Sequence, residues 1–213
     1  KFDDVIITTF GDLMRVPGTH SSLLKERADG RDIRVTYSTF DALEIAKKNP
    51  DKNVVFLGVG FETTAPTIAA AIISAAEKGV DNFSAIAAHK RVPPALAALM
   101  DADNVQIDGF ILPGHVSVII GTGAYYYFFD KFRIPCVIAG FEPVDILHAI
   151  SMLVEQIENS NPKLENAYGR VVTFRGNRKA QEMLTKVFKL ADVAWRGIGT
   201  IPQSGFKIRD EFE

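Results

Sequence analysis

The sequence predicts an α/β fold in which parallel sheets are flanked by helices and form two similar lobes around a cleft. Short apolar runs rich in β-branched residues alternate with helical patterns along the 213 residues. These runs are apolar at consecutive positions, which is typical of parallel strands covered by helices on both faces. Apolar residues make up 47% of the chain, so a sizeable core is expected.

Six strands are predicted, in chain order, at Val5–Phe10, Ile33–Tyr37, Val54–Val59, Phe83–Ala88, Gly109–Leu112 and Pro135–Ala139. A seventh candidate, Arg170–Phe174, follows the turn-like pair Tyr168-Gly169. The stretch from 195 to 206 is rich in Gly and Pro, which favours an extended segment broken by turns.

Start and stop signals place helices between the strands. Ser38–Asp41 resembles a capping box, and Asn49-Pro50 ends the helix that it opens. Pro66 lies near the first turn of an Ala- and Ile-rich helix, and Pro143 opens a longer one. The apolar residues of that longer helix recur at helical spacing and are Ile146, Ile150, Leu153 and Ile157.

The length suits one large or two small domains. The polar segment from 77 to 82 is a candidate hinge, so we expect a first α/β lobe over residues 1–81. A second lobe with a C-terminal extended segment would then cover residues 82–213. Because the chain has no initiating Met and opens almost directly into a strand, we interpret it as a piece of a longer protein.

Composition excludes several classes of function. The formal charge of -2 gives no basic excess for nucleic acid. No apolar run approaches the length of a membrane span, and no signal peptide is visible. A single cysteine cannot form an internal disulfide or hold an iron–sulfur cluster alone, so a reduced, cytoplasmic protein is expected.

Polar residues follow most of the predicted strands. Ligands of open α/β sheets bind outside the carboxyl ends of the strands, so these residues are the candidate site. They are Asp12, Arg15, Glu62, Thr63, Thr64, His89, His115 and Glu142. Together they could perform acid–base chemistry or bind an anion. Each Thr, Asp or Gly among such residues could equally be an ordinary helix cap or turn residue.

More specific motifs are incomplete. Gly58-Val59-Gly60 lacks the third glycine of a dinucleotide fingerprint, and there is no phosphate-binding P-loop. The four histidines lack close metal-ligand spacing, so no metal site is assigned. Cys136 lies in an apolar strand, which favours a buried core residue over a nucleophile.

Read together, the strand-end motifs resemble the HypD family of hydrogenase maturation factors. The matching segments are Thr9–Gly18, Gly60–Pro66, His89-Lys90 with Pro93-Pro94, Leu112–Ser117, Ala139–Pro143, and Trp195–Gly199 with Ser204-Gly205. The resemblance implies an α/β scaffold with two related lobes, which takes part in assembling the Fe(CN)2(CO) precursor of [NiFe]-hydrogenase. It implies two partners, a HypC-like chaperone and a HypE-like cyanide donor, and a [4Fe-4S] cluster.

The chain departs from the family in its cysteines. The family's iron-binding cysteine motif and its Cys-x-x-Cys motif should precede Lys1, and its cluster cysteines should lie mainly after Glu213. Cys136 matches none of them. By resemblance, Asp12, Arg15, Glu62, Thr63, Thr64, His115 and Glu142 would line or support the cleft. Two alternatives stay open: a stand-alone enzyme for a small anionic substrate, with Glu62 or His115 as base, and a two-lobed binding module without chemistry.

Overall fold

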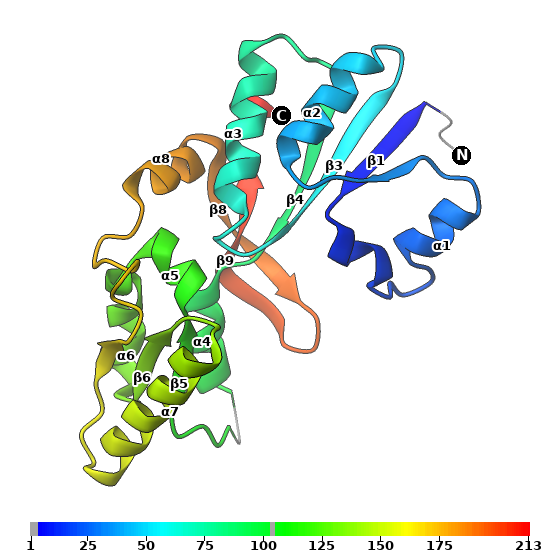
Figure 1. Cartoon of the computed structure of the whole chain (residues 1–213). Helices are drawn as coiled ribbons and strands as arrows, with labels where there is room; N and C mark the ends of the chain where they lie inside the picture. Colours follow the sequence, from blue (N-terminus) through cyan, green and yellow to red (C-terminus); the bar gives the residue numbers. More distant parts are fainter. Residues whose placement is uncertain (1–3, 103–104) are drawn as a thin grey trace.

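The computed structural model describes residues 4–102 and 105–213. In these residues the chain forms two parallel sheets and one antiparallel pair of strands. The parallel sheets lie at opposite ends of the molecule, and the antiparallel pair lies between them (Figure 1). The predicted α/β class with parallel sheets and flanking helices is therefore confirmed.

The first sheet has the strand order β2-β1-β3-β4. Its strands are β1 (Val5–Thr9), β2 (Ile33–Val35), β3 (Asn53–Gly60) and β4 (Phe83–His89), all parallel. Helices α2 (Thr39–Lys48) and α3 (Ala65–Glu77) contact each other and pack on β3 and β4. A short helix, η1 (Gly11–Arg15), follows β1, and α1 (Leu23–Ala28) packs against it and β2.

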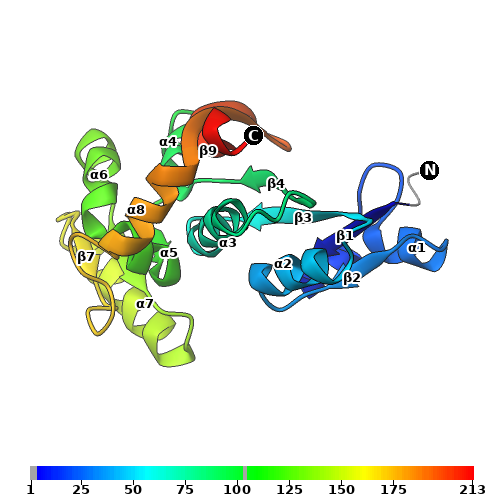
Figure 2. The ribbon, with the colours of Figure 1, turned by 90° about the horizontal axis from the view of Figure 1, so that it is seen from above.

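The second sheet has the order β5-β6-β7 and is also parallel. Its strands are β5 (Phe110–Pro113), β6 (Cys136–Ala139) and β7 (Leu164–Asn166). Helix α5 (Gly114–Ile120) leads through η2 (Thr122–Tyr125) into α6 (Tyr126–Phe132). Helix α7 (Pro143–Glu158) packs on β5 and β6, on the outer side of the molecule (Figure 2).

The two sheets are joined by α4 (Val92–Met100) and by the last part of the chain. Helix α4 begins directly after β4 but packs into the apolar core of the second sheet. Helix α8 (Arg178–Val187) contacts both α3 and α5. The strands β8 (Phe188–Trp195) and β9 (Gly199–Ile208) form the antiparallel hairpin, and η3 (Asp210–Phe212) follows it. Phe188 and Phe206 of this hairpin are buried in the core of the first sheet.

The predicted boundary after residue 81 does not coincide with the boundaries of the sheets. Strand β4 begins after this boundary, yet it pairs with β3 from Val54↔Phe83 to Gly60↔His89. Helix α8 and the hairpin also return to the first core. The two-lobed division into 1–81 and 82–213 stays a prediction, and the pairing of β4 favours a boundary after His89.

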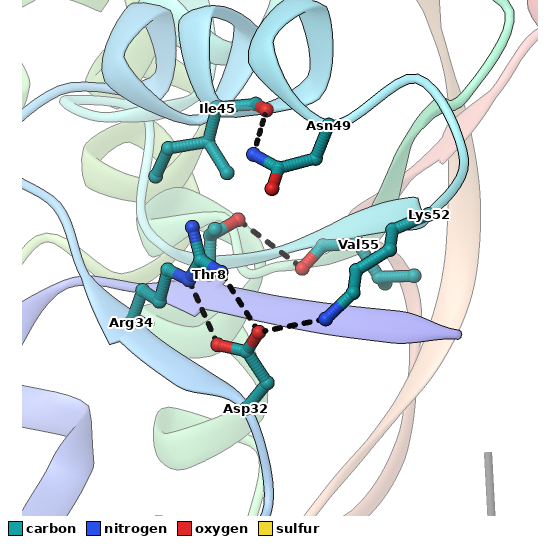
Figure 3. A network of polar contacts seen from close by, with 7 residues as sticks. All are labelled: Thr8, Asp32, Arg34, Ile45, Asn49, Lys52 and Val55. Carbon is teal, nitrogen blue, oxygen red and sulfur yellow. Dashed lines mark hydrogen bonds and ion pairs between the residues drawn. The ribbon is translucent and has the colours of Figure 1, made fainter. Parts of the chain in front are cut away.

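Local sequence signals explain several element ends. Ser38 and Asp41 form the predicted capping box at α2, with the Ser38 hydroxyl accepting from Phe40 and Asp41 accepting from the Ser38 backbone. A group of charged side chains lies at the start of β2, and the Thr8 hydroxyl of β1 donates to Val55 of β3 (Figure 3). Within this charged group, Asp32 accepts two hydrogen bonds of 2.8 Å from the Arg34 guanidinium and lies 3.5 Å from Lys52 Nζ (Figure 3).

One expectation for the second half of the chain was wrong. Arg170–Phe174 is not a strand, because the third strand of this sheet is β7, which comes earlier and pairs with β6. The stretch from 195 to 206 is extended and broken by a turn, as expected, but its pairing with Phe188–Trp195 in a hairpin, with a bulge between Ala191 and Val193, was not predicted. Strand β8 carries no regular alternation of polar and apolar residues, since its polar residues Lys189 and Asp192 are three positions apart, and it follows α8 without a turn.

Candidate functional site

The carboxyl ends of β1 and β3 are adjacent, because these strands pair in parallel. Asp12 and Arg15 lie on η1 at this end of β1, and both are exposed. Asp12 Oδ1 accepts a hydrogen bond of 3.1 Å from the backbone N–H of Leu13, the next residue of η1. Two predicted site residues are thus solvent-accessible at the strand ends.

Glu62 follows β3 and is buried, with 2% of its surface exposed. Its carboxylate accepts hydrogen bonds from the backbone N–H of Val92, at 3.0 and 3.3 Å. Burial raises the pKa of Glu62 to about 7, although the Val92 and Glu62 backbone N–H groups and the Arg91 charge act in the opposite direction. Glu62 is therefore poised to exchange a proton near neutral pH.

The two threonines after Glu62 shape the turn into α3. Thr64 is the residue before α3, and its hydroxyl lies 3.4 Å from the carbonyl oxygen of Phe61. Gly60 has φ 140°, and a β-carbon there would collide with Thr64 Oγ1. The Thr64 side chain is thus engaged in a turn, while Thr63 is half-buried beside it.

His89 ends β4 and is 1% exposed. Neither of its ring nitrogens has a hydrogen-bond partner among the described residues, and the ring lies 5.9 Å from that of Phe188. Burial lowers the pKa of His89 to about 4, so the ring is neutral at pH 7. A group enclosed in this way does not reach the surface of a cleft.

The two cations after His89 hold the hairpin. Lys90 Nζ donates to the carbonyl oxygen of Ala194 at 2.8 Å and lies 5.7 Å above the Trp195 ring. Arg91 donates from its side chain to Gln203 at 2.7 Å and from its backbone to Ser204 at 2.8 Å. These charges fix the hairpin beside β4, so they are not free for a ligand in this arrangement.

A cavity of about 490 Å³ lies between α4, α8 and the hairpin. Glu62 and Arg91 reach it from the first sheet, and Lys189 and Arg209 from the hairpin and its end. Apolar side chains such as Leu184 complete its wall. Three cations thus line this cavity together with one buried carboxyl group.

The second sheet places another group of polar residues at its carboxyl ends. His115 begins α5 and is exposed, with its ring edge-on to Phe141 at a centroid distance of 4.7 Å. Its ring centroid also lies 6.2 Å from that of Tyr168. Glu142 precedes α7 and lies 3.4 Å from Arg170 Nη2. His115 and Glu142 therefore belong to one cluster of aromatic and charged side chains at the second sheet.

Arg170 organises this cluster, and the sequence analysis assigned it to a strand. Its guanidinium donates to both Asp145 oxygens, at 2.9 and 2.6 Å, and stacks on the Tyr168 ring at 4.3 Å. The hydrogen bonds from Arg170 and Glu142 lower the pKa of Asp145. A β-carbon on Gly140 would collide with Asp145, which explains the glycine after β6. In the sequence, the only feature that sets Arg170 apart is its position directly after the turn-like pair Tyr168-Gly169.

The predicted residues therefore form two groups. Glu62, Thr63, Thr64 and His89 gather at the ends of β3 and β4, with Asp12 and Arg15 on η1 after the neighbouring β1, while His115 and Glu142 lie at the second sheet. Within residues 4–102 and 105–213, no hydrogen bond or ion pair joins Asp12 or Arg15 to Glu62, or Glu62 to His115. The single cleft expected from the sequence remains a prediction.

The chain's cysteine is unsuited to metal binding. Cys136 is 0% exposed in the middle of the second core, as expected from its apolar surroundings. Burial raises the pKa of its thiol to about 12, so the thiolate that binds metals is disfavoured. In the part of the chain that the structure describes, no three His, Cys, Asp or Glu residues gather as a metal site.

Comparison with known proteins adds the family. The profile of HypD, described as "Hydrogenase formation hypA family", matches residues 1–213. Hydrogenase maturation factor HypD2 of Bradyrhizobium diazoefficiens is 46% identical over 214 residues, which cover 97% of this chain and 56% of that protein. The HypD of Escherichia coli is 44% identical over 211 residues, which cover 99% of this chain and 57% of the relative.

An archaeal relative gives the same result. A putative hydrogenase expression/formation protein of Methanocaldococcus jannaschii is 43% identical over 208 residues, covering 98% of this chain and 58% of that protein. The chain therefore spans little more than half the length of these relatives. Among the described residues, no helix is both long and apolar enough to cross a bilayer.

Proposed function

The chain belongs to the HypD family, and we propose on this basis that it forms the α/β core of a scaffold for [NiFe]-hydrogenase maturation. The observation that carries the proposal is the family match over residues 1–213, together with relatives named as hydrogenase maturation factors. The scaffold would take part in assembling the Fe(CN)2(CO) precursor, which is its cargo. Its chemistry would be metallocofactor assembly, not ordinary substrate turnover.

The two groups of strand-end residues would line or support the space that receives the cargo. Arg15 and Asp12 are exposed at the first sheet, and His115 and Glu142 at the second. Arg15 and His115 offer N–H donors, which suit the negative charge of cyanide ligands and thiolates. Glu62 would act from beneath this surface by holding the start of α4 through Val92.

The residues of this chain do not fit a [4Fe-4S] cluster. Its single cysteine is fully buried and disfavours the thiolate form, whereas such clusters are held by cysteine thiolates. A cluster in the full-length protein would therefore depend on residues outside this chain. We assign it no role at the sites described above.

The partners follow from the family alone. A HypC-like chaperone and a HypE-like cyanide donor would dock on the full-length protein, in the cytoplasm. The formal charge of -2 does not favour nucleic acid as a partner.

The experiment is complementation of a strain that lacks its own HypD. Full-length protein carrying Arg15→Ala or His115→Ala should give much less active [NiFe]-hydrogenase at an unchanged level of soluble protein. Exposed strand-end residues contribute little to folding, so the loss would report on function. Arg27→Ala, on the exposed surface of α1, is the matched control. Normal hydrogenase activity in both site variants would reject their assigned roles.

A second candidate function is binding of a small anion. The cavity of about 490 Å³ supports it, because Lys189 and Arg209 line it in addition to Arg91, whose guanidinium is already engaged by Gln203. Titration calorimetry of the full-length protein with inorganic phosphate and with acetate tests this. Saturable binding that Lys189→Gln abolishes would favour the binding module, and no heat with either anion would reject it.

A further inference from the structure

Helix α7 is apolar on the side that faces away from its sheet. Ala149 and Gln156 are its buried residues and point toward the sheet. Four large apolar side chains lie on the outer side instead: Val144 and Leu147 are 76% and 67% exposed, and Val154 and Ile157 are each 46% exposed. Ile150, at 43%, continues the same stripe.

This stripe overturns part of the reading of α7 from the sequence. Ile150 and Ile157 recur at helical spacing, which ordinarily marks the buried face of a helix. Both are exposed, while the half-buried Leu153 contributes to the contact with the sheet. Because α7 meets the sheet through small and half-buried residues, its larger apolar side chains are left without a partner among the described residues. Contiguous exposed apolar surface of this kind marks interaction sites.

The stripe runs the length of the helix and continues beyond its start. It steps by three or four residues from Val144 to Ile157, a span of 14 residues that corresponds to about 20 Å. Phe141, 62% exposed, precedes it and packs against the His115 ring. The outer face of α7 is therefore continuous with the aromatic cluster at the second sheet. A straight ridge of this shape packs best against another helix.

The charges on α7 are all of one sign. The helix contains Asp145, Glu155 and Glu158 but no Lys or Arg. Glu155 and Glu158 are exposed and border the apolar stripe. They also lie in the last turn, where the helix dipole disfavours acidic residues. A basic partner would offset this repulsion.

We propose that the outer face of α7 binds an amphipathic helix of another protein, whose apolar face is bordered by Lys or Arg. The stripe from Val144 to Ile157 supplies the apolar contact, and Glu155 and Glu158 pair with the basic border. Phe141 places one end of this helix beside His115. The proposed surface adjoins the strand-end residue His115 through Phe141, but its contacts are made by other side chains, those of α7.

The test uses full-length protein and a model peptide. The peptide is an amphipathic Leu/Lys helix of about 18 residues, or roughly five turns, carrying a fluorophore. We expect saturable binding by fluorescence anisotropy, which the double variant L147S/V154S weakens by about tenfold or more. Tyr127→Ser, on the exposed surface of α6, is the matched control and should not change binding. A Leu/Glu peptide of the same length should bind much more weakly.

A second measurement identifies the occupant in cells. A photo-crosslinking amino acid is placed at position 147 of the full-length protein, with position 127 as control. Crosslinks from 147 to a basic amphipathic helix of a different protein support the proposal. Crosslinks to another segment of the same polypeptide, or to a second copy, would overturn it. Absence of specific crosslinks, or equal binding of both peptides, would also overturn it.

Discussion

Glu62 and the backbone of Val92 form a contact between the two halves of the fold. Both carboxylate oxygens of Glu62 lie within hydrogen-bonding distance of the Val92 nitrogen, at 3.0 and 3.3 Å. Glu62 follows a strand of the first sheet, whereas Val92 opens α4, which packs into the core of the second. Because Glu62 is buried and its pKa is raised to about 7, the carboxyl group in this contact passes between its neutral and charged forms near neutral pH.

We therefore predict that Glu62→Gln stabilises the full-length protein at pH 8. The pKa of Glu62 is higher in the folded state, at about 7, than its ordinary value of 4.5. The folded state thus holds a proton that the unfolded state has lost, so stability falls as pH rises from 4.5 to 7. The Gln variant avoids this loss, which amounts to at most about 3 kcal/mol.

Thermal and denaturant unfolding at pH 4.5 and pH 8 measures this difference. The variant should gain stability at pH 8 and little at pH 4.5, while the exposed control Glu182→Gln should change little at either pH. An equal change at both pH values would contradict the assignment, because it would arise from packing and not from ionisation.

For His89 we predict the opposite pH dependence of stability. Its folded pKa of about 4 lies below the ordinary value of 6.5, so its contribution makes stability fall as pH decreases from 6.5 to 4. Both ring nitrogens are buried and have no hydrogen-bond partner in the part of the chain that the structure describes, and such groups cost about 1–3 kcal/mol each. We expect His89→Leu to raise the free energy of unfolding at pH 7 and to flatten the acid side of the stability profile.

The exposed residue His20 supplies the control for this measurement. His20→Leu should leave both the stability at pH 7 and its acid dependence nearly unchanged. A His89→Leu protein that is less stable at pH 7 would show that the imidazole has a favourable partner, and the prediction would fail.

The first six predicted strands matched because their apolar, β-branched runs are buried strands of parallel sheets. Val54–Val59, for example, lies within β3, where Val54 and Phe56 are fully buried. The short strand β7 was missed because its three residues, Leu164–Asn166, carry no such run. It is defined by its pairing with β6, which is a long-range property that local periodicity does not contain.

The candidate site shows a similar limit. Asp12 and Arg15, on η1, and His115, near the start of α5, are exposed after the strands that they follow. Burial of Glu62 and His89 could not be predicted, because it arises from Val92 and Phe188, which lie far away in the sequence. Arg170 was likewise hidden, since its importance comes from Asp145 and Tyr168 and not from its neighbours in the chain.

Arg170→Lys should reduce hydrogenase maturation more than it reduces stability. The guanidinium donates two hydrogen bonds to Asp145 and stacks on Tyr168, and a Lys ammonium cannot reproduce this geometry. Exposed ion pairs contribute little to stability, so the melting temperature should change little. The measurement is active hydrogenase per full-length protein in the complemented strain. Arg133→Lys, whose exposed pair with Asp130 lies outside the cluster, is the control. Equal hydrogenase maturation by Arg170→Lys and Arg133→Lys would show that Arg170 has no role in maturation.

Cys136 should prove dispensable for any iron–sulfur cluster of the full-length protein. Its thiol is buried and has a pKa of about 12, so very little thiolate is present at pH 8. Alkylation of Cys136 by iodoacetamide, followed by peptide mass spectrometry, should be slow in the folded protein and fast in denaturant. Cys136→Ala should lower stability through the lost packing but leave iron and acid-labile sulfide per protein unchanged. Loss of cluster in a folded Cys136→Ala protein would instead show that this cysteine is a ligand, and the conclusion that this chain's residues do not fit the cluster would be wrong.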